Sequence, residues 1–262
     1  MAELYLTELT QYISHVIFEK LLNQLYDKDK EKILKYKKNK DRERTLMGRL
    51  LLKQIFMDRF KNEVQTVKHF DKLKQHLASY ESKLMDICKI NNFLKNIYYD
   101  QYGRPLQNEY PFIDFNISHS GNIVVCGITE NGRIGVDVEE EKYIDLNTIR
   151  NCFAKEEIDF LEQLPEISKL SYFYHTWTLK EAYIKAVGST FLINLDSFWF
   201  DLADMKNPVF HIKNGIVKEK WSFYSYRIKK KYRLSVCIEG TDVINFLILD
   251  EQKLINDMLS IN

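Results

Sequence analysis

Hydrophobic and polar positions follow two different patterns along the chain. In the first half, apolar residues recur at helical spacing through residues 45–60 (TLMGRLLLKQIFMDRF), which predicts a helix with one buried side. The lysine-rich run before it, residues 28–44, holds nine Lys or Arg against four Asp or Glu, and we expect it to form an exposed end of that helical region. Residues 61–95 contain no Gly or Pro, so more helix is expected there.

Short runs rich in β-branched and aromatic residues dominate after Pro111. Residues 122–129 and 133–140 flank the turn sequence Glu-Asn-Gly, which predicts a β-hairpin. Helical patterns follow at residues 145–164 and 169–188, and the second ends at a glycine. Three further β-rich runs close the chain, at residues 195–202, 220–228 and 232–240. This order predicts an α+β fold with a boundary near Pro111.

The composition is that of an ordinary globular protein: 262 residues, 45% hydrophobic and 29% charged, with a formal net charge of +1. A net charge this small gives no field that favours nucleic acid. No apolar run approaches the roughly 18 residues of a membrane span, and the N-terminal segment has no secretory signal pattern. The four cysteines form no CxxC motif, which argues against a zinc site and for reduced thiols. We therefore expect a cytoplasmic protein with no nucleic-acid or membrane partner.

A pair of acids lies in the apolar run IGVDVEE. Because side chains alternate across a strand, Asp137 and Glu139 share one face while Val136 and Val138 share the other. Two adjacent carboxylates repel unless a proton or a cation intervenes, and oxygen ligands of this kind suit Mg²⁺. The alternative is a half-exposed strand face without a metal, and the pair by itself does not decide between the two.

Two further groups bear on that choice. In WTLKEAYIK, Trp177, Glu181 and Lys185 are spaced four apart and project from roughly one helix face. They form either a surface ion pair beside a core tryptophan or a third carboxylate with a cation that reaches a phosphate. In NISHSG, His119 lies between two serines, which indicates either a polar turn or a hydroxyl and an imidazole that hold phosphate oxygens. The chain has no GxSxG, GxxxxGK[ST] or GxGxxG motif.

Taken in order, these blocks resemble one family. FNISHSG, IGVDVEE and FYHTWTLKEAYIKAVG look like the three signature blocks of the Sfp-type (surfactin-type) 4′-phosphopantetheinyl transferases, and the resemblance is clear from Phe115 to Phe198. A weaker likeness reaches upstream, where residues 43–52 (ERTLMGRLLL) resemble the family's RTLLG helix and residues 102–105 (YGRP) its YGKP turn. In that turn Arg104 stands where lysine is commoner, which keeps the charge but changes the hydrogen-bond geometry.

The resemblance implies a fold and a reaction. The fold would be α+β, with two similar α/β subdomains related by a pseudo-two-fold axis and an active-site cleft between them. Residues 1–114 would form one, with a helical insertion at about residues 61–95, and residues 115–262 the other, with the metal site. The enzyme would be a monomeric holo-carrier-protein synthase. It would transfer 4′-phosphopantetheine from coenzyme A to a serine of an apo acyl- or peptidyl-carrier protein and release adenosine 3′,5′-bisphosphate.

The resemblance also implies roles for single residues. Mg²⁺, or Mn²⁺ in its place, would be held by Asp137, Glu139 and Glu181. Glu181 or a metal-bound water would take the serine proton, and Lys185 would hold a phosphate oxygen and help to stabilise the leaving group. Catalysis would fall to Glu181, Lys185 and Asp137. The contacts to coenzyme A would come from Lys28, Lys32, Arg44, Arg104, Ser118, His119 and Lys185.

Two departures from the family pattern and two alternative functions stand beside this interpretation. The segment at residues 61–95 is longer than the family's usual connection. Some relatives have an acid or an amide at the position of Val138. Here the valine faces away from the two carboxylates and cannot act as a base, so the base role shifts to Glu181 or water.

One alternative is another metal-dependent phosphodiesterase or nuclease, against which the Ser118-His119 and WxxKE blocks argue. The other is a non-catalytic module that binds carrier proteins, against which the intact carboxylates and Lys185 argue.

Overall fold

Helices and strands both occur along the chain, which confirms the mixed α+β class. The computed structural model describes residues 1–10, 13–67, 97–101, 104–107, 112–145, 152–188, 193–213, 220–241 and 243–260. The chain forms two compact units, which we call the sheet unit (Met1–Leu6, Tyr99–Leu106 and Phe112–Ile248) and the helical unit (Thr7–Tyr98, Gln107–Pro111 and Leu249–Asn262). The division at residue 114 into two similar subdomains stays a prediction.

The described helices of the helical unit are α1 (His15–Leu22), α2 (Asp27–Leu34), α3 (Asn39–Val67) and α7 (Glu251–Leu259). α3 contacts each of the other three. The helix predicted over residues 45–60 is confirmed, and its side chains Leu46, Leu50 and Phe56 are fully buried. The single buried side predicted for it is wrong, because every residue from 45 to 57 except Arg49 is buried. The lysine-rich run forms α2 and the start of α3. The helix predicted over residues 61–95 is confirmed as far as Val67, and the rest of that segment lies outside the described residues.

The larger sheet of the sheet unit has the strand order β11-β1-β5-β4. Its strands are β1 (Ala2–Glu8), β4 (Asp114–Ser120), β5 (Ile123–Thr129) and β11 (Ile244–Ile248). β4 and β5 form an antiparallel hairpin in which Ser120 lies opposite Ile123. Gly121 of its two-residue loop has a φ of +57°, the left-handed conformation that such loops require. The segment NISHSG is therefore mostly strand, and the polar turn considered for it is wrong.

The second sheet has the order β6-β10-β9. Its strands are β6 (Ile134–Glu140), β9 (Trp221–Ile228) and β10 (Tyr232–Glu239). Two smaller sheets pair β2 (Ile97–Tyr99) with β3 (Pro105–Gln107) and β7 (Phe198–Asp201) with β8 (Val209–Ile212). A short 3₁₀ helix, Leu195–Ser197, precedes β7. The three β-rich runs predicted near the end of the chain are thus confirmed as β7, β9 and β10.

The hairpin predicted between residues 122–129 and 133–140 is wrong, although both strands exist. β5 pairs with β4 in the larger sheet, whereas β6 pairs with β10 in the second. The residues between them carry the chain from one sheet to the other. The strand patterns could not distinguish these cases, because the apolar side chains of β5 and β6, Val125 and Val136 among them, face one shared core in either arrangement.

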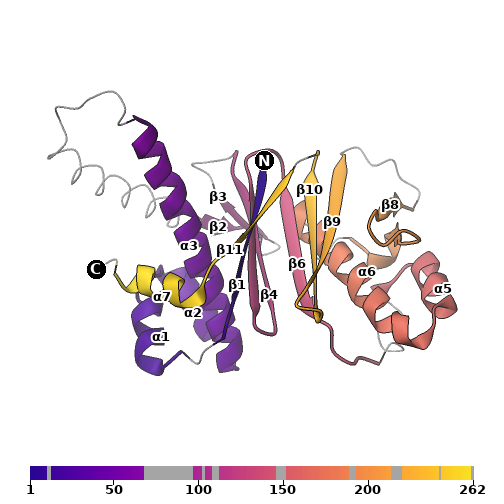
Figure 1. Ribbon diagram of the computed structural model, residues 1–262, viewed down its shortest axis with the longest axis horizontal. Helices are drawn as coiled ribbons and strands as arrows, with labels where there is room; N and C mark the ends of the chain where they lie inside the picture. Colours follow the sequence, from indigo (N-terminus) through magenta and orange to yellow (C-terminus); the bar gives the residue numbers. More distant parts are fainter. Residues whose placement is uncertain are drawn as a thin grey trace. The chain divides into compact units, whose positions relative to one another are not determined.

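The two sheets enclose a core built from β1, β5, β6 and β10. α6 (Glu166–Val187) covers the other side of the second sheet, and Figure 1 shows it beside β6, β10 and β9. α5 (Lys155–Gln163) packs on α6 and β7. Gly188 ends α6 with a φ of +79°, as predicted. None of the described helices combines the length and the apolar character that a membrane crossing requires.

Candidate active site

The contact between β6 and α6 depends on a glycine. A Cβ added to Gly135 would lie 2.0 Å from the Ala182 carbonyl oxygen and 2.5 Å from the Ala186 nitrogen. Both distances are far shorter than carbon can approach these atoms, so no side chain larger than hydrogen fits. The two alanines lie four apart on α6 and present small side chains to the strand. The backbones of β6 and α6 therefore come close together, and the side chains that follow on each element come within reach of one another.

Three carboxylates and a lysine gather beside this contact. Asp137 and Glu139 lie on the same face of β6 as Gly135, as the alternation predicted. Lys185 Nζ donates to Asp137 Oδ1 at 2.6 Å, and the ion pair joins the strand to the helix. A pocket of about 290 Å³, which we call the Asp137 pocket, is lined by Ile117, Ser118, His119, Asp137, Glu139, Trp177, Glu181 and Lys185.

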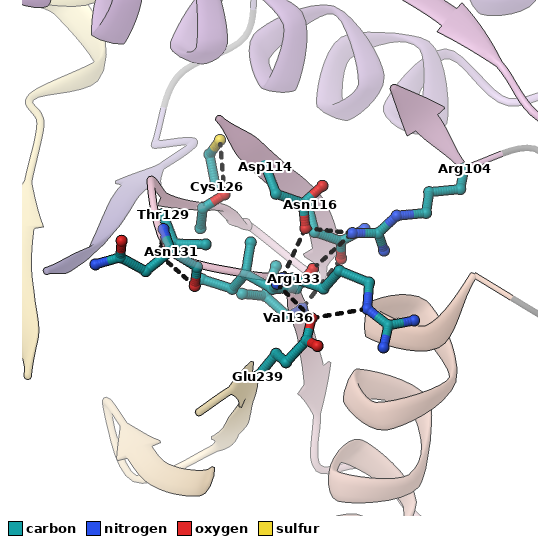
Figure 2. Close-up of polar contacts among 11 residues, drawn as sticks. Arg104, Asp114, Asn116, Cys126, Thr129, Asn131, Arg133, Val136 and Glu239 are labelled. Atoms are coloured by element: carbon teal, nitrogen blue, oxygen red, sulfur yellow. Dashed lines mark hydrogen bonds and ion pairs between the residues drawn. The ribbon is translucent and has the colours of Figure 1, made fainter. Parts of the chain in front are cut away.

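A ladder of side chains joins β4 to β6, and we call it the β4–β6 ladder. The two strands lie side by side, yet each backbone pairs with another strand. Side chains on alternate residues of β4 accept the free amide N–H groups of β6 instead. The rungs are Asp114 to Ile134 (2.7 Å), Asn116 to Val136 (3.0 Å), Ser118 to Val138 (3.2 Å) and Ser120 to Glu140 (3.1 Å). Figure 2 shows the first two of them.

The last two rungs of the ladder also contact the carboxylates. Ser118 Oγ donates to Asp137 Oδ1 at 3.0 Å and accepts from Lys185 Nζ at 3.2 Å. Ser120 Oγ donates to Glu139 Oε2 at 2.7 Å. The hydroxyl of Ser118 is therefore engaged in holding Asp137 and Lys185, and its predicted contact with coenzyme A stays a prediction.

Burial and mutual repulsion make two of the carboxylates weaker acids. Burial, and after it the charge of Asp137, raises the pKa of Glu139 above its ordinary value of 4.5, against the opposing effects of the Ser120 hydrogen bond and the Lys185 charge. Burial and then Asp137 also raise the pKa of Glu181, and Lys185 opposes the shift. A cation placed among these groups would relieve the same repulsion.

The carboxylate oxygens in the pocket are of the type that binds a hard cation such as Mg²⁺. Asp137 is only 3% exposed, and its Oδ2 has no hydrogen-bond partner. A buried carboxylate oxygen without a hydrogen-bond partner is energetically costly, and a bound metal ion is one group that would supply the missing interaction. Among the described residues, no three His, Cys, Asp or Glu side chains are arranged to hold a metal as they stand. A glutamate side chain would have to turn toward Asp137, so the predicted ligand set of Asp137, Glu139 and Glu181 stays a prediction.

The other residues predicted to contact coenzyme A have different surroundings. Arg104, 8% exposed, pairs through Nη2 with Asp114 and donates to a carbonyl oxygen of β6 at 3.2 Å (Figure 2). Its guanidinium thereby helps to hold Asp114, the first β4 side chain of the β4–β6 ladder, in position. Three of the predicted residues belong to α2 and α3 of the helical unit: Lys28, Lys32 and Arg44. The coenzyme A contacts of all four stay predictions.

Sequence reasoning missed the role of the residue next to Glu181. Lys180 and Glu157 form an ion pair of 2.8 Å in which both side chains are fully buried. Lys180 Nζ also donates to the carbonyl oxygens of Leu195 at 2.8 Å and Phe198 at 2.6 Å. The pair ties α6 to α5 and to the start of β7. It therefore fixes the helix on which Glu181 is presented to the pocket.

Comparisons with known proteins agree with this geometry. Residues 133–237 match the family described as the 4′-phosphopantetheinyl transferase superfamily. That range contains β6, α6 and most of β10, and with them the three carboxylates and Lys185.

Three relatives show how far the similarity extends. The 4′-phosphopantetheinyl transferase gsp of Aneurinibacillus migulanus is 28% identical over 264 residues, covering 98% of this chain and 94% of its own. The 4′-phosphopantetheinyl transferase Sfp of Bacillus subtilis (strain 168) is 26% identical, with 86% of each chain covered. Another 4′-phosphopantetheinyl transferase of Bacillus subtilis is 32% identical over 142 residues, covering 54% of this chain and 62% of its own. The likeness to gsp and Sfp thus spans most of the chain.

Proposed function

This chain belongs to the Sfp-type 4′-phosphopantetheinyl transferases, and from that premise we propose how its residues carry out the transfer. The enzyme transfers the 4′-phosphopantetheine group to carrier proteins. The donor is coenzyme A, the acceptor is a serine hydroxyl of an apo acyl- or peptidyl-carrier protein, and adenosine 3′,5′-bisphosphate leaves. The observation that carries this assignment is the Asp137 pocket, where three carboxylates and Lys185 surround one space.

The metal of the reaction is Mg²⁺, with Mn²⁺ as the alternative, and its ligands are Asp137, Glu139 and Glu181. Mg²⁺ prefers carboxylate oxygens and takes the rest of its coordination from phosphates and water. When bound, it neutralises the charge on the pyrophosphate oxygens of coenzyme A. The buried and unpartnered Oδ2 of Asp137 supports this role, because it is the oxygen that such an ion would satisfy.

Glu181 receives the proton of the attacking serine hydroxyl, directly or through a water. Its place in the lining of the Asp137 pocket supports this role, since a general base must lie within hydrogen-bond reach of the proton it takes. Val138 projects into the core between the sheets, so it offers no competing base beside Glu139. The serine oxygen then bonds to phosphorus, and the bond to the leaving bisphosphate breaks.

Lys185 is the cation that meets the phosphates. Its ammonium group has three N–H donors. Asp137 and Ser118 each accept one hydrogen bond from it, at 2.6 Å and 3.2 Å, so the third N–H can reach a phosphate oxygen. Held in this way, the charge is already oriented before coenzyme A arrives, and it stabilises the leaving group without having to reorganise.

Coenzyme A lies in a cleft between two similar subdomains of one monomer, residues 1–114 and 115–262. The contacts with its phosphates and adenine come from Lys28, Lys32, Arg44, Arg104, Ser118 and His119. The state of Lys32 supports its part: burial, and then the charge of Arg49, lower the pKa of its ammonium group. A phosphate placed beside Lys32 would offset the repulsion between these two cations.

The transfer is tested by weighing a carrier protein. The chain is incubated with coenzyme A, Mg²⁺ and an apo carrier protein, and the intact mass of the carrier is measured. We expect a gain of one 4′-phosphopantetheine group that disappears when Mg²⁺ is chelated. No gain across several acyl- and peptidyl-carrier proteins would refute the transferase. Release of bisphosphate from coenzyme A with no change in the carrier would favour the phosphodiesterase alternative.

A further inference from the structure

Ser118 and Ser120 repeat one arrangement two residues apart on β4. Each hydroxyl accepts an amide N–H of β6, from Val138 at 3.2 Å and from Glu140 at 3.1 Å. Each also donates to the carboxylate one residue earlier on β6, which is Asp137 at 3.0 Å for Ser118 and Glu139 at 2.7 Å for Ser120. The repeat arises because side chains alternate along both strands with a period of two.

The direction of each hydroxyl hydrogen follows from these partners. A serine hydroxyl has one hydrogen and two acceptor lone pairs, whereas an ionised carboxylate only accepts. The N–H of Glu140 takes a lone pair of Ser120 Oγ, so the hydroxyl hydrogen of Ser120 points at Glu139 Oε2. Rotating the hydroxyl away would leave the carboxylate without this donor in a half-buried place. The hydrogen bond therefore fixes the Glu139 side chain as well as the strand.

The first two rungs of the β4–β6 ladder provide a contrast. Asp114 and Asn116 accept the N–H groups of Ile134 and Val136 without a bond to Asp137 or Glu139 among their described contacts. They hold β6 in place, and Figure 2 shows both side chains with these contacts. The serines do this and also contact the acids, so their hydroxyls have a second role that strand support alone does not require.

We propose that Ser120 is a positioning residue for the metal site. Its hydroxyl occupies Oε2 of Glu139 and thereby directs Oε1 toward the ion that Glu139 would share with Asp137. The proposal rests on the proposed function, since it concerns the same pocket. Carboxylates that bind metals are commonly held by such hydrogen bonds, and losing one weakens metal affinity by roughly 10–100-fold. Ser118 acts in the same way on Asp137, but it is shared with Lys185, so Ser120 gives the cleaner test.

A matched pair of substitutions isolates the hydroxyl. Ser120→Thr and Ser120→Val place side chains of nearly equal size and β-branching on a strand that tolerates both. They differ in that threonine keeps the oxygen and its hydrogen. Mn²⁺ affinity is measured by titration calorimetry on the protein alone, below its unfolding temperature. We expect the threonine variant to bind Mn²⁺ like the wild type and the valine variant to bind it about 10–100-fold more weakly.

Kinetics and unfolding separate positioning from mere support of the strand. In the valine variant, the Mg²⁺ concentration for half-maximal transfer should rise, while the KM for coenzyme A at saturating Mg²⁺ stays unchanged. A purely structural role would lower the unfolding temperature and leave Mn²⁺ affinity equal in the two variants, and that result overturns the proposal. Wild-type protein that binds Mn²⁺ but modifies no carrier would refute the transferase and not the role of Ser120. Wild-type protein that binds no Mn²⁺ would overturn the metal site and the role of Ser120 together.

Discussion

Replacing Lys180 with methionine should destabilise the protein strongly, although Lys180 is fully buried and does not line the Asp137 pocket. The substitution leaves the buried Glu157 carboxylate without its cation, and two carbonyl oxygens lose their donor. Glu157 still accepts the N–H groups of Ala154 and Phe200, both at 3.0 Å, so it remains held in place. Breaking a buried pair from one side costs about 3–5 kcal/mol. In a chain of this size that lowers the Tm by roughly 6–20 °C.

The loss should depend on pH with a definite sign. Burial raises the pKa of Glu157, and Lys180 opposes this shift. In Lys180→Met the pKa of Glu157 in the folded protein rises further above its value in the unfolded chain. At low pH the carboxyl is neutral in both states, whereas at high pH the folded protein must bury a charged carboxylate without its cation. Stability is therefore retained below the unfolded pKa and lost as pH rises through the folded one. The variant should be closer to the wild type at pH 5 than at pH 8.

Thermal unfolding followed by circular dichroism measures these effects. Adding Glu157→Gln to Lys180→Met removes the unpaired charge and should recover part of the lost stability. Lys169→Met is the matched control, because Lys169 lies on the same helix and pairs at 2.9 Å with Glu166, which is 85% exposed. A surface pair of this kind contributes about 0–1 kcal/mol. A Lys180→Met variant as stable as this control would refute the reasoning.

Two further predictions concern the approach of α6 and the acidity of the pocket. Gly135→Ala should push α6 from β6, because its Cβ would meet the Ala182 carbonyl oxygen at 2.0 Å, and both the Tm and the rate of transfer should fall; an unchanged rate would contradict the close packing. Protons should compete with the metal at pH values above 4.5, because burial and Asp137 raise the pKa of Glu139 and Glu181. The Mg²⁺ concentration for half-maximal transfer, measured between pH 5 and 8, should therefore decrease as pH rises, and a flat profile would contradict it.

Local periodicity predicted two halves of the pocket, and the family resemblance joined them into one site. The two-residue period of a strand put Asp137 and Glu139 on one face. The four-residue spacing of a helix put Glu181 and Lys185 on another. The structure brings these faces together beside Gly135. Position 135 requires glycine because Ala182, 47 residues further along the chain, packs against it. Neither the strand pattern nor the helix pattern alone predicts that contact.

The missed features are those in which a polar residue serves the fold. Asp114, Asn116, Ser118 and Ser120 occupy alternate positions of β4, as expected for one face of a strand. Because that face is polar, the segment lacks the apolar alternation that usually indicates a strand, and it was interpreted as a turn. The Gly-Asn pair after it was a hairpin signal that could have corrected this. The predicted pairing between β5 and β6 was wrong for a different reason. Two strands bury the same side chains whether they pair in a hairpin or face each other from two sheets.

Lys180 was missed because burial of a lysine depends on partners far away in the chain. Its helix positions show one usable signal: Thr176 lies four residues before it and Tyr183 three after, and both are buried. A lysine within such a stripe needs a buried acid to pair with. The acid, Glu157, lies on a separate helix, and nothing in the spacing of the sequence connects the two.

The claim that the Asp137 pocket performs the transfer is tested most directly at Glu181. The intact mass of an apo carrier protein is measured after incubation with coenzyme A, Mg²⁺ and each of three proteins: the wild type, Glu181→Gln and Glu140→Gln. Glu140 is the control, since it lies on β6 next to Glu139 but pairs with Lys142 and Lys231. We expect the phosphopantetheine mass from the wild type and Glu140→Gln and none from a folded Glu181→Gln. Near-normal transfer by Glu181→Gln would contradict its roles as ligand and base.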